Sequence, residues 1–236
     1  AGKKFSFDPR LSWYLTLDWH DVDVSNVIKL PAGTQEDLDD LTTGTTFAVI
    51  GTLTWNTLDE YLSYSKGHII DLSVEHALDM LGADWTYTKY WAQGRYYIPV
   101  MGLGDFLDFN LGKEDNPPIF ATRVKAGFSS GILPSAERYS LGGSNSLRGY
   151  DGGEFEGDEM FLANVEARIP IESAFGFVLF YDIGNAWRGE DNFSFSDLHD
   201  SWGVGVRVKT PLGNLRLDYA QGKDENKTHF GFGELF

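Results

Sequence analysis

Cysteine is absent from the 236 residues. Without it, the chain can form neither a disulfide framework nor a metal site built on thiolates. Long apolar runs are absent too, because nowhere do 18 or more apolar residues follow one another. A helix therefore cannot carry the chain across a membrane, whereas barrel strands, in which only alternate residues are apolar, are compatible with this pattern.

Positive charge is scarce: 19 Lys and Arg stand against 35 Asp and Glu, so the net charge is -16. This balance argues against nucleic acid as a partner, because phosphate contacts need a surplus of Lys and Arg. Residues 1–4 contain no apolar signal-peptide core. We expect an export signal, if the protein has one, to lie outside these residues.

Residue patterns typical of catalysis are also lacking. The five histidines follow no metal-ligand or triad spacing, and no nucleophile motif accompanies them: His20, His68, His76, His199 and His229. The sequence therefore predicts no enzyme activity, no metal and no cofactor.

Aromatic residues and glycine are abundant, at 15% of the chain and 27 residues, and they favour strands and tight turns. Apolar and polar residues alternate in about ten segments. In the segment 202–210, Trp202 and Val204 share one face, and Arg207 lies on the other. The ten segments span residues 11–19, 47–57, 67–80, 84–100, 119–128, 159–169, 175–187, 202–210, 214–219 and 228–236.

These segments are long enough to cross a membrane. A tilted barrel strand needs about 9 to 11 residues, whereas strands of soluble proteins average about 5 to 6. Charges on one face would lack partners inside a sandwich but can be hydrated or paired in a barrel lumen. The sequence therefore predicts an all-β fold, a transmembrane antiparallel β-barrel of about 10 to 12 strands, as a single domain over residues 1–236.

The lengths of the connections indicate an orientation. Long connections are expected at 21–46, 129–158, 188–200 and 221–227, and short turns at 172–173 and 211–213. Barrels of bacterial outer membranes carry long loops outside and short turns on the periplasmic side. Both termini are then expected on the periplasmic side. The connections 58–65 and 101–118 are longer than expected there, and we assign no function to the second.

One run of the sequence is distinctive. Leu141-Gly-Gly-Ser-Asn-Ser-Leu-Arg148-Gly-Tyr150 resembles the inward-folding loop of the outer-membrane assembly and translocation superfamily typified by BamA, TamA and the two-partner secretion transporters. Further stretches follow in that family's order: 164–170, 180–185, 203–207, 210–213 and 215–220, with a terminal Phe. The resemblance covers residues 47–236, and the ordered combination is far more specific than any one motif.

The resemblance implies a functional loop motif of Leu147, Arg148, Gly149 and Tyr150, with Glu166 and Asp182 as acidic partners of Arg148. Strand alternation agrees with this set, because it places both carboxylates inside the barrel, on neighbouring strands. A loop that folds inward could bring its guanidinium to both of them. Gly142 and Gly143, with Gly149, would allow the sharp turns that such a loop needs.

Interpretations that give these residues no functional role stay open. Arg148 could be a solvated loop residue and the two acids ordinary lumen charges, or the set could stabilise the barrel without any part in a working cycle. In the last strand, Phe230, Phe232 and Phe236 could be a recognition signal for assembly machinery, as the resemblance implies, or simply its lipid-facing side.

Family members usually carry periplasmic POTRA domains and about sixteen strands, and neither is found in this sequence. Closure would require segment 11–19 to pair with segment 228–236. Otherwise a second copy must satisfy the open edges, which would make a homodimer, or the chain is a fragment of a longer protein.

The leading hypothesis is a bacterial outer-membrane barrel, surrounded by lipid, that assists insertion or translocation of client proteins or lipid-linked substrates without covalent chemistry. The alternative is a structural or passive narrow-pore barrel that has lost translocase activity.

Overall fold

The computed structural model describes residues 2–4, 8–24, 42–60, 65–100, 116–171, 174–189, 193–211 and 213–236. All ten expected strands are present, with ends shifted by a few residues. They are β2 (Leu11–Val22), β3 (Gly44–Asn56), β5 (Ser65–Ala77), β6 (Tyr87–Pro99), β7 (Ile119–Gly131), β10 (Glu159–Pro170), β11 (Phe175–Trp187), β12 (His199–Thr210), β13 (Gly213–Gln221) and β14 (Asn226–Phe232).

Four shorter strands and two 3-10 helices complete the described elements. They are β1 (Gly2–Lys4), β4 (Asp59–Glu60), β8 (Tyr139–Leu141), β9 (Phe155–Gly157), η1 (Ser135–Glu137) and η2 (Phe195–Asp197). No helix in the described ranges is long and apolar enough to cross a membrane. Most of the expected connections 21–46 and 101–118 lie outside the described residues.

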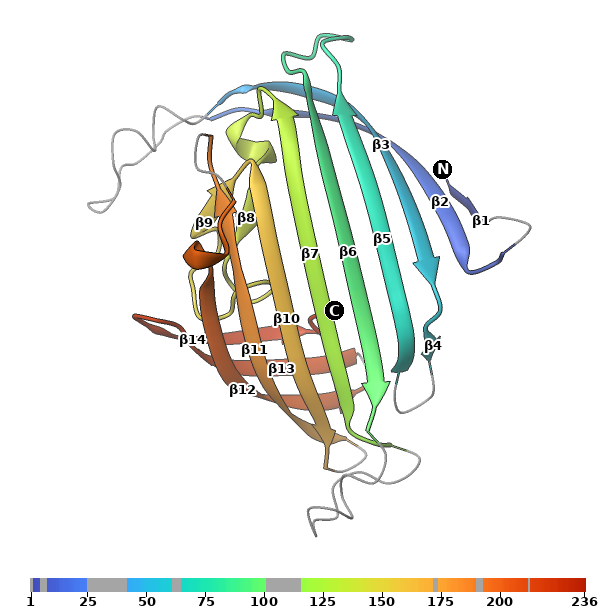
Figure 1. The fold of residues 1–236 in the computed structure, drawn as a ribbon, viewed down its shortest axis with the longest axis vertical. Helices are drawn as coiled ribbons and strands as arrows, with labels where there is room; N and C mark the ends of the chain where they lie inside the picture. Colours follow the sequence, from blue (N-terminus) through green and yellow to red (C-terminus); the bar gives the residue numbers. More distant parts are fainter. Residues whose placement is uncertain are drawn as a thin grey trace.

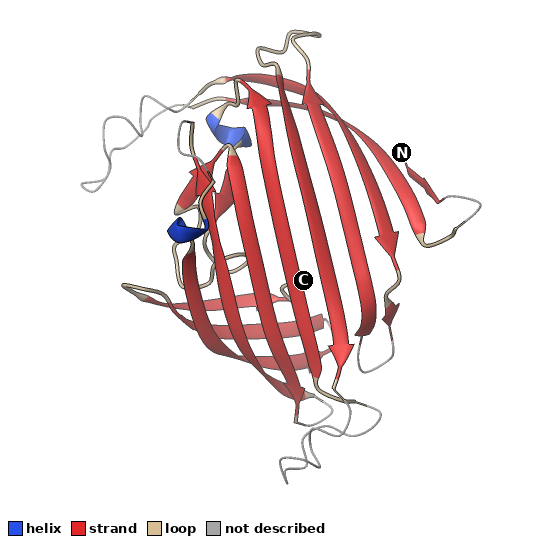
Figure 2. Ribbon diagram, viewed as in Figure 1, coloured by secondary structure: helices blue, strands red, loops and turns tan. Residues whose placement is uncertain are grey.

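The long strands form one curved antiparallel sheet in which chain neighbours pair in turn (Figures 1 and 2). The order is β1-β2-β3-β5-β6-β7-β10-β11-β12-β13-β14, and β4 adds a short pairing with β5. The predicted all-β antiparallel architecture is confirmed. Closure of the first strand on the last is not found, because β1 and β14 are the two ends of the sheet in the part of the chain that the structure describes.

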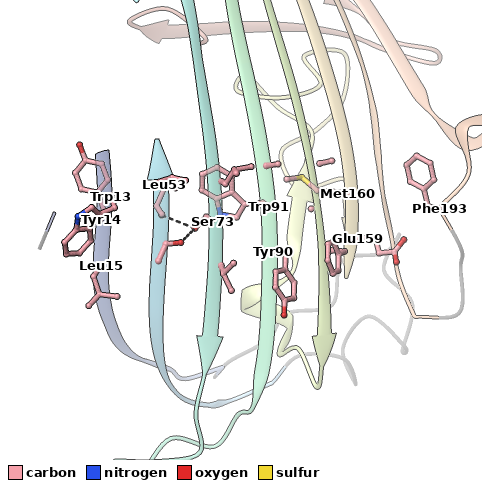
Figure 3. A pocket seen from close by; sticks show the side chains of 18 residues that line it. Trp13, Tyr14, Leu15, Leu53, Ser73, Tyr90, Trp91, Glu159, Met160 and Phe193 are labelled. Atoms are coloured by element: carbon pink, nitrogen blue, oxygen red, sulfur yellow. Dashed lines mark hydrogen bonds between the residues drawn. The ribbon is translucent and has the colours of Figure 1, made fainter. Parts of the chain in front are cut away.

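The two faces of the sheet differ as the alternation predicts. One face is apolar and exposed, with Leu17, Trp19 and Phe177 among its most exposed side chains. Small residues lie on this face too: Gly51 of β3, and the paired Ala92 of β6 and Ala126 of β7. They line an apolar depression of about 860 Å³ that is bounded by Trp13, Leu53 and Tyr90 (Figure 3). The buried charged residues of the strands, among them Asp71, Arg123 and Asp218, lie on the opposite, concave face.

The connection between β7 and β10, residues 132–158, is called the inner loop here. It starts slightly later than expected because β7 extends to Gly131. Its short strands β8 and β9 pair with each other and lie beside β11 (Figure 1). Leu141, Leu147 and Tyr150 are buried in one cluster with Met160 and Leu162 of β10. This packing attaches the loop to the concave face of the sheet.

The end of the chain departs from the prediction. Strand β14 ends at Phe232, not at Phe236, and Gly233 takes a φ of 80°, which glycine adopts without strain. The last residues turn inward, where the Phe236 ring lies 5.1 Å from the guanidinium carbons of both Arg123 and Arg168. Placing Phe236 on the lipid-facing side of a closing strand was therefore wrong. Phe230 and Phe232, at 63% and 70% exposed, do lie on the apolar face.

Candidate functional site

Arg148, at the tip of the inner loop, is fully buried on the concave face. Its guanidinium donates two hydrogen bonds to Asp182 of β11, from Nε at 2.8 Å and from Nη2 at 2.7 Å. Nη1 donates to Glu166 of β10 at 2.7 Å and lies 3.4 Å from Asp218 of β13. These four side chains, all without solvent exposure, are called the Arg148 cluster. The paired, planar contact with Asp182 is one that lysine could not reproduce.

The excess negative charge of the cluster is balanced by a ring of further arginines. Arg168 donates to Glu166 at 2.8 Å, and Arg207 donates to Asp218 at 2.5 Å. Asp182, in contrast, has no second arginine among the described residues within 4.0 Å. Arg148 is therefore the principal counter-charge of Asp182.

Burial alone would lower the pKa of the Arg148 guanidinium. The hydrogen bonds that the guanidinium donates to Asp182, together with the charges of Asp182, Glu166 and Asp218, outweigh burial, so the pKa of Arg148 lies above its ordinary value. The guanidinium therefore carries its positive charge at neutral pH.

Neutral groups complete the environment of Arg148. The face of its guanidinium lies 3.4 Å from the centre of the Phe180 ring. Asn164 of β10 donates to Asp182 at 2.7 Å and to the backbone carbonyl of Ser146 in the loop at 2.8 Å. Its own carbonyl oxygen accepts from Arg123 of β7. Asn164 therefore links the loop, the acidic partner and the wall of the sheet.

Glycine allows the loop to come this close. A Cβ on Gly149 would lie 2.6 Å from both Ser201 and Gly222, at the point where the Gly149 N–H donates to the Ser201 hydroxyl at 3.2 Å. Gly142 has a φ of 115°, and a Cβ there would clash with the backbone oxygen of Asp151. Gly143 also has positive φ. A larger residue at either of the first two sites would push the loop away from the sheet.

The rest of the expected motif also contacts the wall. Leu147 is fully buried in the loop core. The Tyr150 hydroxyl donates to the backbone carbonyl of Asp200 at 3.0 Å. On β14, His229 faces inward and donates to the backbone carbonyl of Arg148 at 2.7 Å. The inner loop is thus tied to β10, β11, β12, β13 and β14.

A second set of contacts ties the loop to the other end of the sheet. Glu137 of η1 lies 2.9 Å from His20 of β2 and 3.2 Å from Lys89 of β6. Thr42, next to β3, exchanges hydrogen bonds with Ser135. The inner loop therefore bridges the concave side from the first long strand to the last.

The sequence predicted part of this arrangement. The structure brings Arg148 together with Glu166 and Asp182, which fits the geometry that the resemblance implied; their role in function stays a prediction. Asp218 and Asn164 were missed as partners, although alternation already places Asp218 opposite Leu217, on the inward face. No group of three or more His, Asp or Glu side chains in the described segments could hold a metal ion.

Comparisons with known proteins agree with this architecture. Outer envelope protein 80 of chloroplasts from Arabidopsis thaliana is 30% identical over 154 residues, which are 58% of this chain and 21% of that protein. The outer membrane protein assembly factor BamA of Nitratidesulfovibrio vulgaris is 31% identical over 128 residues, 45% of this chain and 16% of its own length. The chain thus spans about a fifth or less of these relatives.

A solved structure matches the fold at low sequence identity. BamA from Haemophilus ducreyi lacking POTRA domains 1-3 superimposes with a TM-score of 0.69 at 18% identity and covers 97% of this chain and 51% of that one. The model of the Omp85 superfamily domain matches residues 2–236. Since that match extends over almost the whole sequence, the chain belongs to the Omp85 superfamily.

Proposed function

We propose that this chain is the membrane-embedded barrel of an outer-membrane protein that assists insertion or passage of client proteins or lipid-linked substrates, without covalent chemistry. Members of the Omp85 superfamily mediate protein insertion or translocation in outer membranes. One relative is named an assembly factor of outer membrane proteins. Family membership and the docked inner loop support the extension of this activity to the present chain.

The proposed location follows from the exposed apolar face, which needs lipid as its solvent. The relatives come from a bacterial outer membrane and from the chloroplast outer envelope, and we favour the bacterial outer membrane. Strand β2 begins, and β14 ends, on the side of the short turns. This is the side that we assign to the periplasm.

The proposal rests on one observation: a loop held on the concave face of the sheet by a buried cation that pairs with carboxylates on three strands. Such a loop can change position only if the Arg148 cluster separates as a unit, because leaving any one of these charges unpaired in the interior is costly. The cluster is thus suited to hold one of two loop positions. We infer that it keeps the lumen closed until a client or substrate engages.

The free edges of the sheet offer a second working element. Beyond the three residues of β2 that pair with β1, the outer edge of β2 carries no strand partner among the described residues, and neither does the outer edge of β14. Backbone groups at such edges must be paired within a membrane. We propose that these two edges pair with each other, with further strands, or with a second copy of the chain in a homodimer. We also propose that a strand of a client protein can pair with the same edges.

A passive barrel is the second candidate, and the completeness of the ion pairing favours it. Every carboxylate of the Arg148 cluster has an arginine partner, and a loop so well satisfied could serve only to fill the lumen. In that case the chain would be a structural element or a narrow pore.

Arg148→Ala and Asp182→Arg test the proposal. Each variant is compared with wild type for complementation of the deleted gene and for insertion of a barrel client into proteoliposomes. A heat-modifiability gel shift monitors folding. Arg188→Ala is the control, because Arg188 forms an exposed contact with Glu156 outside the cluster.

We expect both cluster variants to lose insertion activity, whereas Arg188→Ala keeps it. Arg148→Lys, which retains the charge without the paired geometry, should keep the gel shift and lose activity. Normal complementation and a normal gel shift in both cluster variants would contradict the proposal. Steady conductance in planar bilayers without any insertion by wild type would favour the passive barrel.

A further inference from the structure

A polar cavity lies beside the Arg148 cluster, between the inner loop and the wall of the sheet. Its volume is about 410 Å³, which is in the range of small-ligand sites. Four cations line it: Lys89 from β6, Arg123 and Lys125 from β7, and Arg138 from the loop. Among the residues that the structure describes, Glu75 of β5 is the one carboxylate in the lining. The cavity is thus strongly cationic in a chain whose net charge is -16.

The cations differ in how they are neutralised. Lys89 lies 3.2 Å from Glu137 and 3.9 Å from Glu75, so it has carboxylate partners. Arg123, only 8% exposed, donates to Asn164 and to the backbone carbonyl of Asn145, and both acceptors are neutral. Lys125 lies 5.1 Å from the centre of the Trp91 ring. Within the described ranges, no carboxylate comes within 4.0 Å of either Arg123 or Lys125.

This arrangement contrasts with the Arg148 cluster, where Arg148 and the neighbouring Arg168 and Arg207 all have acidic partners. A buried or half-buried cation without a counter-charge is costly, and the cost falls when an anion occupies the adjacent space. The neutral lining supplies further polar groups, including Gln93 of β6 and Ser140 of β8. Cationic side chains and neutral donors around one cavity are the chemistry that recognises an oxyanion.

We propose that this cavity binds a small oxyanion of the phosphate class, with Arg123 and Lys125 as its principal contacts. The anion is either free phosphate or the phosphate of a small organic molecule such as a lipid headgroup. Because the cavity wall is formed partly by β5, β6, β7 and β10 and partly by the loop residues 138–146, the bound anion holds the loop against the sheet. Occupancy therefore stabilises the docked position of the inner loop.

The test uses the whole chain refolded in detergent micelles. Inorganic phosphate is titrated by calorimetry, and thermal unfolding is followed in parallel, with chloride adjusted to keep the ionic strength constant. Glycerol 3-phosphate is the second probe and represents a lipid headgroup. Trypsin cleavage within residues 132–158 reports loop docking.

We expect wild type to bind phosphate and to unfold at higher temperature with it. Lys125→Gln should weaken binding by about tenfold or more, because one charge-assisted contact is lost. Lys125→Arg should retain binding. The control is Lys209→Gln, since Lys209 is exposed at the far end of β12 and lies outside the cavity. Tighter binding of glycerol 3-phosphate than of phosphate would identify the headgroup as the source.

Absence of phosphate and glycerol 3-phosphate binding to folded wild type would overturn the inference without reference to any variant. So would equal binding by Lys125→Gln and Lys209→Gln. The inference does not require client insertion, so a protein that binds phosphate but inserts no client would refute the proposed function alone.

Discussion

The contribution of Arg148 to the free energy of unfolding can be measured, together with its coupling energy to each acidic partner. Replacing Arg148 by Met removes the charge and keeps most of the apolar volume. Breaking a buried ion pair from one side costs about 3–5 kcal/mol, because the remaining charge has no compensation. Here Glu166 keeps Arg168, and Asp218 keeps Arg207. Among the described residues, Asp182 keeps only neutral donors, the amide of Asn164 and the backbone N–H of residue 148. We therefore expect a loss of about 3 kcal/mol, at the lower end of the range.

The geometry also predicts how this energy is divided. The Arg148 guanidinium and Asp182 share two hydrogen bonds of 2.7 and 2.8 Å, whereas the guanidinium makes a single contact with Asp218 at 3.4 Å. Double-mutant cycles with Asp182→Asn and Asp218→Asn should give a coupling energy of about 2–3 kcal/mol for the first pair and less than about 1 kcal/mol for the second. The difference reflects both the distance and the alternative arginines around Asp218.

The free energies of unfolding come from equilibrium unfolding in urea of the protein reconstituted in lipid vesicles. Unfolding is followed by the fluorescence of the seven tryptophans. Arg188→Met serves as the control, because its ion pair with Glu156 is exposed and such pairs contribute below about 1 kcal/mol. Equal coupling to Asp182 and Asp218, or a loss in Arg148→Met no larger than in Arg188→Met, would refute this reasoning.

Two further predictions concern the loop and the chain end. Gly149→Ala should displace the loop tip and raise trypsin cleavage within residues 132–158, because the new Cβ would lie 2.6 Å from Ser201. The control Gly152→Ala should leave cleavage unchanged, because a Cβ there would have nothing within 4 Å. Equal cleavage in both would contradict the tight fit. Since the chain lacks cysteine, single spin labels at Phe230→Cys and Phe236→Cys can be compared in bilayers. Only the first label should be relaxed strongly by lipid-dissolved oxygen, and strong relaxation of both would show that Phe236 does not remain inside.

Alternation along the chain was enough to predict the strands and their faces. A strand turns successive side chains to opposite sides, so an apolar set such as Trp202 and Val204 specifies one face wherever the sheet lies. Glu166 and Asp182 could be assigned to the concave face in the same way. Their meeting with Arg148 was expected from the resemblance, because nothing in the alternation says where a loop will fold.

Tertiary structure decided the contacts that depend on several separate segments. Asp218 lies three strands from Glu166, and whether it reaches Arg148 depends on sheet curvature and loop docking. Phe236 was placed wrongly because the period of the last strand was extended past Gly233, where the backbone turns inward. The cationic cavity has the same origin, since Arg123 and Lys125 become neighbours of Arg138 only when the loop lies against β7.

The sequence by itself thus determined the elements and the face to which each side chain points, because both follow from the local geometry of the backbone. The folded chain alone decided which inward-facing charged side chains meet and which cations have no carboxylate beside them. These contacts act over a few ångströms, yet they join residues as far apart in the sequence as Arg148 and Asp218, which are 70 positions apart.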